Sequence, residues 1–186
     1  MATRVVLIEA GPTPWDTEGR IIGSRPLPLT AEGIDAMRHL VETLPFPVQS
    51  VYRPRINEAC DQAAKMIAQR FDLRPRDNAD LDAVNLGHWE GLTPADLNFR
   101  FPTVFPQWLE NPLAVTPPDG EALPAAVRRI SDAARRIVRR NRGLAVALAL
   151  RPMSLQIALG TLSGETLETI ASHLHRQQPI ATIEIE

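Results

Sequence analysis

Two continuous apolar segments near opposite ends of the chain constrain its fold more than any other feature. Residues 4–10 read RVVLIEA and residues 143–150 read GLAVALAL. Apolar runs of this kind are typical of strands at the centre of a parallel sheet that is covered on both faces. Between them, apolar residues at helical spacing alternate with a shorter strand-like run, VQSVY at 48–52. This alternation predicts an α/β protein, a three-layer α/β/α sandwich around a mainly parallel central sheet.

Apolar residues at helical spacing predict the helices of this sandwich. Thr30 is a good N-cap for a first helix, and a second is expected from Ile56 to Phe71. A third covers residues 121–141, EALPAAVRRISDAARRIVRRN, with apolar residues on one face and arginines on the other. Another helix is expected to begin at Pro152, and IATIEIE at 180–186 alternates as a half-buried strand does.

Length and composition favour one globular domain over residues 1–186. The net charge of −2 gives no reason to expect nucleic acid or an acidic membrane as a partner, and no apolar run is long enough to span a membrane. The single cysteine, Cys60, excludes an intramolecular disulfide. Without a signal-peptide segment at the N-terminus, a cytoplasmic location is expected.

Seven arginines lie between Arg128 and Arg142. Such a helix could bind nucleic acid or phospholipid, but no aromatic residues interleave with these arginines, as they do on single-stranded nucleic-acid surfaces. Asp132 and the apolar face of the same segment favour a solvated outer helix that covers the sheet.

The loops that follow the three apolar runs are where a ligand is expected, because sheets of this kind bind ligands beyond the carboxyl ends of their strands. The first loop and its flanks, VVLIEAGPTPWDTEGRIIGSRPLPLTAEG at 5–33, resemble the opening of the histidine phosphatase (phosphoglycerate mutase-like) superfamily. LGHWEGLTPADL (86–97) is similar to its Gly-x-Trp-Glu-Gly segment, and LAVALALRPMSLQIAL (144–159) to its closing strand and helix. The resemblance covers roughly residues 4–186 and implies an excursion over residues 86–122 that covers the pocket.

The chemistry of that family implies five side chains. A histidine takes the phosphoryl group, two arginines and a second histidine bind the phosphate, and a carboxylic acid protonates the leaving oxygen. Where the first loop of the family has Arg-His-Gly, this chain has Glu9, Ala10 and Gly11. By this resemblance, the methyl group of Ala10 stands where the family has its nucleophile, and the carboxylate of Glu9 stands where the family has its first arginine.

The other three family positions are also changed. When the second loop is matched to the family motif without a gap, Glu58 occupies the position of the second arginine. In a shifted register, Arg55 would occupy that position and supply a positive charge. Ala83 falls on the acid, next to Asp82, which is expected to point the other way in an extended segment. Arg151 stands for the second histidine. No family catalytic residue is therefore expected intact.

The pocket of such a chain is expected to be lined by family-equivalent residues and to hold no metal or cofactor. We hypothesise that Glu9 and Arg151 form a salt bridge across it with Glu58 nearby, because a buried arginine needs a partner. The expected lining is Glu9, Ala10, Gly11, Asp16, Arg20, Glu58, Ala83 and Arg151.

These features favour a catalytically inactive protein, a pseudophosphatase with a binding or regulatory role towards a protein partner or a small ligand, for example a cationic one. The first alternative is a phosphomonoester phosphatase or mutase with a rebuilt active site, running through Asp16, Glu58, Cys60 or His88. The second is a structural subunit that pairs with an active paralogue or forms a homodimer, and an exposed apolar patch around Trp108 would favour it.

The remaining histidines and aromatic residues have ordinary interpretations. His88, His173 and His175 are expected at the surface, since no third ligand suggests a metal site. Trp89, Trp108 and the segment 101–105 are expected to pack in the core or in the excursion.

Overall fold

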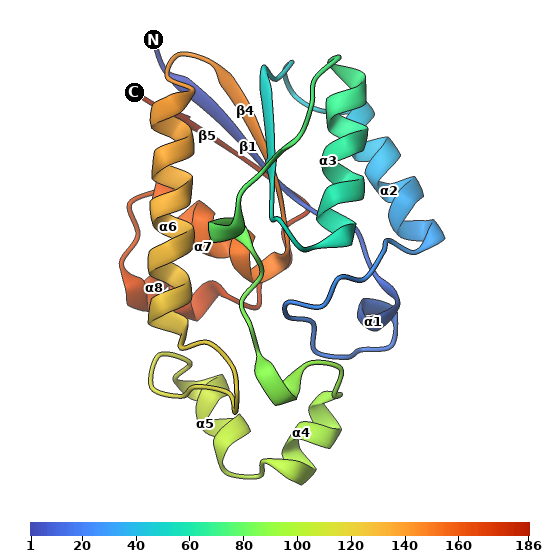
Figure 1. The fold of residues 1–186 in the computed structure, drawn as a ribbon. Helices are drawn as coiled ribbons and strands as arrows, with labels where there is room; N and C mark the ends of the chain where they lie inside the picture. Colours follow the sequence, from blue (N-terminus) through green and yellow to red (C-terminus); the bar gives the residue numbers. More distant parts are fainter.

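The computed structural model describes residues 1–186, and a five-stranded sheet forms its centre (Figure 1). The central strands β1 (Thr3–Glu9) and β4 (Ala145–Leu150) run parallel, with Val5 opposite Val146. They are flanked by β2 (Ser50–Arg53), β3 (Arg76–Asp77) and β5 (Ile180–Ile185), in the order β3-β2-β4-β1-β5. Only β5 pairs antiparallel. The predicted α/β fold with a mainly parallel sheet is confirmed.

Helices cover both faces of this sheet (Figure 1). One face carries α2 (Ala31–Glu42) and α3 (Glu58–Arg70); the other carries α6 (Leu123–Arg140), α7 (Pro152–Leu162) and α8 (Leu167–His173). Side chains of β1 alternate between the two resulting cores, Val5 and Leu7 entering one and Val6 and Ile8 the other. This alternation explains why the strand is apolar at every position from Val5 to Ile8, since each of these side chains meets a helical layer.

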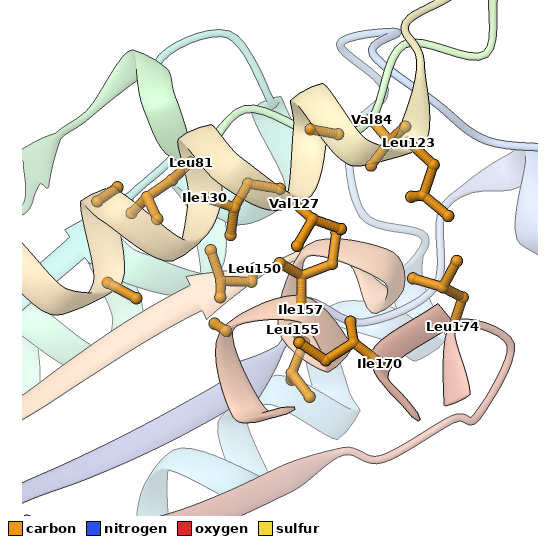
Figure 2. Close-up of a cluster of buried hydrophobic side chains, with 14 of the residues drawn as sticks. Leu81, Val84, Leu123, Val127, Ile130, Leu150, Leu155, Ile157, Ile170 and Leu174 are labelled. Carbon is orange, nitrogen blue, oxygen red and sulfur yellow. The ribbon is translucent and has the colours of Figure 1, made fainter. Parts of the chain in front are cut away.

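The core between α6, α7 and the sheet holds the start of α7 in place. Val127 and Ile130 of α6 lie near Leu155 and Ile157 of α7 (Figure 2). Complete burial of a side chain of this size stabilises the fold by about 1.5–3 kcal/mol. Because α7 follows β4 after one residue, the same packing fixes Arg151 at the carboxyl end of β4.

The excursion, residues 86–122, lies beyond the carboxyl ends of the parallel strands (Figure 1). The short helices before and within it are η1 (Ala79–Leu81), η2 (Gly87–Trp89), α4 (Pro94–Arg100) and α5 (Val104–Glu110). Trp89 is fully buried and packs edge-on against Phe105 and Trp108, with ring centroids 5.6 and 5.5 Å apart. Trp108 is buried too, although its neighbours on α5, Val104 and Leu109, are exposed, as is Phe99 of α4.

Local signals explain several helix boundaries. The Thr30 hydroxyl accepts a hydrogen bond from the Gly33 amide, as expected of an N-cap. The second long helix begins at Glu58 rather than Ile56, because the Asn57 side chain accepts a hydrogen bond from the Cys60 amide and caps it. On α6 the arginines are exposed, apart from Arg129 and Arg136, which are half-buried. No helix is both long and apolar enough to cross a membrane.

Candidate ligand site at the carboxyl ends of β1 and β4

A cavity of about 410 Å³, the main cavity, opens where β1 and β4 end. It is lined by the loop after β1 with the one-turn helix α1 (Pro14–Thr17), by the excursion and residues 83–84 before it, by the first turn of α7, and by residues 174–177 after α8. Most of its wall is apolar. The hydrophobic side chains include Ile21, Ile22, Val84, Leu86, Trp89, Phe105, Trp108, Leu109, Met153 and Leu174.

Arg151 is the buried cation of this cavity, with a side chain only 5% exposed. Its Nη2 donates to both carboxylate oxygens of Asp16, at 2.9 Å each. Its Nη1 donates to the main-chain oxygens of Ala10 and Gly11, at 3.5 and 3.3 Å. Asp16 also accepts hydrogen bonds from the amide and hydroxyl of Thr13, at 2.7 and 2.8 Å. The Arg151–Asp16 pair is therefore close to neutral, and its carboxylate is fully occupied.

The hypothesised Glu9–Arg151 salt bridge is wrong. The Glu9 carboxylate instead accepts a hydrogen bond from the main-chain amide of Gln178 at 3.0 Å. It lines a second cavity of about 290 Å³, together with Ala10 and Gly11. Burial raises the pKa of Glu9, an effect opposed by the Gln178 hydrogen bond and by the charge of Arg151. The physical reason for the error is α1, which holds Asp16 beside Arg151 and leaves Glu9 to turn toward the segment before β5.

The second loop does not reach either cavity. Glu58 is the first residue of α3 and is exposed, so its expected approach to Arg151 is not observed. Arg55, the alternative in a shifted register, pairs with Asp77 at 3.1 Å. Arg53 lies beside Asp61, with its Nε 2.9 Å from the carboxylate. Neither arginine lines the main cavity.

Ala83 and Arg20 do line the main cavity. Ala83 contributes only a methyl group where the family resemblance implies an acid. Its neighbour Asp82 points elsewhere and accepts a hydrogen bond from the Arg55 amide at 2.6 Å. Arg20 pairs with Glu18 and donates to the main-chain oxygen of Gly91 at 2.7 Å. The Glu18 carboxylate thus balances the positive charge of Arg20 at the main cavity.

The candidate nucleophiles and the histidines differ in burial, in their partners and in whether they line a cavity. Cys60 is fully buried and lines neither cavity, and burial raises the pKa of its thiol to about 12. His88 is exposed and lies 2.9 Å from the Asp119 carboxylate. His173 is 3.5 Å from Glu165. Of the histidines, only His175 lines the main cavity, where it packs edge-on against Trp108, and burial lowers its pKa. No group of three or more His, Cys, Asp or Glu side chains is arranged to hold a metal.

Three polar atoms of cavity-lining residues lack a hydrogen-bond partner: Nε1 of Trp89, Nε of Arg151 and Oγ of Ser154. Ser154 was not among the residues predicted to line the pocket. The available signal was its position two residues after Pro152, in the first turn of a helix that follows a buried strand.

Two glycines shape the first loop. A Cβ atom on Gly11 would lie 2.8 Å from the main-chain oxygen of Gly33, and one on Gly33 would lie 2.5 Å from that of Pro12. The Thr30 amide also donates to the main-chain oxygen of Pro12 at 2.9 Å. The loop after β1 and the start of α2 therefore touch backbone to backbone, which only glycine permits.

This geometry defines an α/β protein with a ligand cavity at the carboxyl ends of its central parallel strands. The chain belongs to the histidine phosphatase superfamily (branch 1), whose family model matches residues 5–186. Among curated proteins, it is 25% identical over 176 residues to the "Bifunctional protein Rv2228c" of Mycobacterium tuberculosis. That match covers 87% of this chain and 46% of the relative, so the chain spans about half the length of the curated relatives it matches.

Solved structures share the whole fold. The alpha-ribazole phosphatase of Shigella flexneri has a TM-score of 0.87 and 22% identity over 98% of this chain and 91% of its own. Bacillus stearothermophilus YhfR has a TM-score of 0.85 and 24% identity over 100% and 92%. Entamoeba histolytica phosphoserine phosphatase, with 3-phosphoglyceric acid, has a TM-score of 0.82 and 18% identity over 97% and 89%. At these identities the likeness shows the fold.

Proposed function

We propose that this chain is a non-catalytic member of the superfamily that binds a small ligand in the main cavity. The observation that carries the proposal is the state of the one buried cation. Asp16 occupies Arg151 through both carboxylate oxygens. A transferring phosphoryl group carries charge on its equatorial oxygens, and such a group needs free, preorganised cations.

The residues implied by the family resemblance support the same proposal. Ala10 offers no nucleophile and Ala83 no acid, and Glu58 faces solvent away from the cavity. Cys60 is not a replacement, because a thiol with a pKa of about 12 is protonated at neutral pH and thiolate is the nucleophilic form.

The size and wall of the main cavity support a binding role. Its volume of about 410 Å³ lies within the range of roughly 300–1,000 Å³ common for small-molecule sites. Its wall is mainly apolar with a few converging polar groups, which is the usual composition of such sites.

One observation favours a second candidate, a phosphomonoester phosphatase with a rebuilt site. His175 lines the cavity, and its lowered pKa favours the neutral imidazole, which is the form able to attack phosphorus. The solved structures named as phosphatases belong to this functional class.

A hydrolysis assay separates the two. Purified protein is incubated with p-nitrophenyl phosphate, phosphoserine and other phosphomonoesters, with and without Mg²⁺ or Mn²⁺, between about pH 4 and 9, where carboxyl and imidazole groups titrate. The expected result is no turnover above background. A Glu9→Arg/Ala10→His variant serves as a test of substrate access. Turnover that survives purification and is lost in His175→Ala or Asp16→Asn would overturn the proposal in favour of a rebuilt enzyme.

A further inference from the structure

The second cavity carries a negative charge that its wall does not balance. Its charged lining residues are Glu9 and Asp16, and no arginine, lysine or histidine lines it. Arg151 neutralises Asp16 through both carboxylate oxygens, and Arg151 itself lies outside the wall of this cavity. The carboxylate of Glu9 is therefore the uncompensated charge.

The end of β1 and the segment before β5 hold Glu9 in this wall. The main-chain amide of Glu9 donates to the main-chain oxygen of Pro179 at 3.0 Å, and Oε2 of Glu9 accepts a hydrogen bond from the main-chain amide of Gln178 at 3.0 Å. The other carboxylate oxygen, Oε1, accepts no hydrogen bond from the protein. Burial raises the pKa of Glu9, because the ionised carboxylate loses part of its hydration there. A cation bound at Oε1 would offset that loss.

The polar atoms of the wall are mainly hydrogen-bond acceptors. The main-chain amide of Ala10 donates to the main-chain oxygen of Leu150 at 2.9 Å and is thus used within the sheet. Pro12 and Pro179 also line the cavity, and proline has no amide hydrogen to donate. An ionised carboxylate only accepts hydrogen bonds, whereas a primary ammonium only donates them. The ligand group that complements this wall is therefore a positively charged donor.

The apolar part of the wall defines the body of the ligand. One face of α2 contributes Ala36, Met37 and Leu40, which lie within about one helical turn of one another. The volume of about 290 Å³ lies at the lower end of the range of roughly 300–1,000 Å³ that is common for small-molecule sites. A short aliphatic chain suits a cavity of this size and wall.

We propose that the second cavity binds a small aliphatic primary amine in its ammonium form. The ammonium group donates to Oε1 of Glu9, and the hydrocarbon chain packs against Ala36, Met37 and Leu40 of α2. This inference goes beyond the proposed function, because it assigns a ligand class to a cavity other than the main one.

Calorimetric titration with three probes of one carbon skeleton tests the inference: 3-methylbutylamine, 3-methylbutan-1-ol and 3-methylbutanoate, in a buffer free of amines. At about pH 8, carboxyl groups are normally ionised and alkylamines protonated. The amine is expected to bind about tenfold more tightly than the alcohol, because charge-assisted hydrogen bonds are roughly twice as strong as neutral ones. The carboxylate is expected not to bind, since Glu9 repels it. Absence of amine binding, or binding of the alcohol or the carboxylate as tightly as the amine, would overturn the inference.

Two variants test the placement of the ammonium group. Glu9→Gln removes the charge and is expected to weaken amine binding about tenfold, to the affinity of the alcohol. Ala36→Lys introduces a cation at an exposed position of the cavity wall and is expected to weaken amine binding by a similar factor. His39→Lys is the matched control, because it adds a positive charge at an exposed position of the same helix outside the cavity wall, and it should keep the wild-type affinity. Wild-type amine affinity in both test variants, with the fold intact by circular dichroism, would contradict the placement.

The two proposals fail in different ways. Turnover of phosphomonoesters overturns the non-catalytic function and leaves the amine site of the second cavity standing. Failure of the amine to bind, without any turnover, overturns the amine site alone.

Discussion

Asp16 and Arg151 form a salt bridge with both carboxylate oxygens 2.9 Å from one guanidinium nitrogen, although 135 residues separate them in the chain. Asp16 follows β1 and Arg151 follows β4, so the pair joins the carboxyl ends of the two central strands. The pair gives the cavity its low net charge and holds the α1 loop against the start of α7.

Breaking this pair is expected to destabilise the fold. In Asp16→Asn, Arg151 stays buried without a countercharge; losing one partner of a buried ion pair costs about 3–5 kcal/mol, and we expect about 2 kcal/mol because Asp16 is 30% exposed. Urea denaturation measures the change. Asp35→Asn, which breaks the exposed pair with Arg38, should change stability by less than about 0.5 kcal/mol. Equal effects of the two substitutions would contradict this role of Asp16.

Arg129 is expected to be a structural arginine, unlike its neighbours on α6. It donates to both carboxylate oxygens of Glu121 at 2.7 Å and to the main-chain oxygens of Asp80, Asp82 and Ala83. Arg129→Ala should lower the free energy of unfolding by about 2–3 kcal/mol, since it leaves several acceptors unpaired. The exposed neighbour gives the control, because Arg128→Ala should have almost no effect in the same denaturation experiment.

Glu9 makes stability depend on pH in a defined direction. Burial raises its pKa above the ordinary 4.5, so its ionisation costs more in the folded than in the unfolded chain. The stability contributed by the protonated form is complete below about pH 4.5 and is lost as pH rises through the folded pKa. Glu9→Gln should therefore match the wild type near pH 4 and exceed it at pH 7. An exposed control, Glu42→Gln, should show no such crossover in thermal melts.

Cys60 should limit stability at alkaline pH. Its thiol titrates near 9.0 in the unfolded chain and at about 12 when buried, so the unfolded state loses the proton first. Stability is unaffected below pH 9 and falls above it, by up to about 1.4 kcal/mol per pH unit until the folded pKa is reached. The slope should be shallower for Cys60→Ala in denaturation curves between pH 8 and 10.5. Rapid reaction of the native thiol with Ellman's reagent at pH 8 would show that Cys60 is more accessible than its burial implies.

The sheet and its helical layers were predictable because their signals are local. The apolar run at 143–150 meets a helix on each face, and Thr30 caps α2 as its position predicts. Strand β3, Arg76–Asp77, has only two exposed residues and carries no pattern to detect. It pairs with β2 because the chain returns there after α3.

The site was predictable in its place but not in its contacts. The strand ends identify Arg151 as a cavity residue, and Asp16 was among the expected lining residues. Whether Arg151 pairs with Glu9 or with Asp16 depends on the direction of the chain after Pro12, and the one-turn helix α1 determines that direction. The three unpaired polar atoms also escape sequence reasoning, because only the folded structure shows which buried side chains stay without a hydrogen-bond partner.

The backbone contact between Gly11 and Gly33 separates the path of the first loop from the chemistry that it carries. Main-chain atoms, and not the side chains at positions 9 and 10, set that path. Position 9 can therefore change its charge and reactivity while the loop keeps its course, whereas Ala10, which is 2% exposed within the core, leaves little room for a larger side chain. Such a loop can present different side chains on an unchanged backbone. A designer could install new functional groups there without rebuilding the scaffold around it.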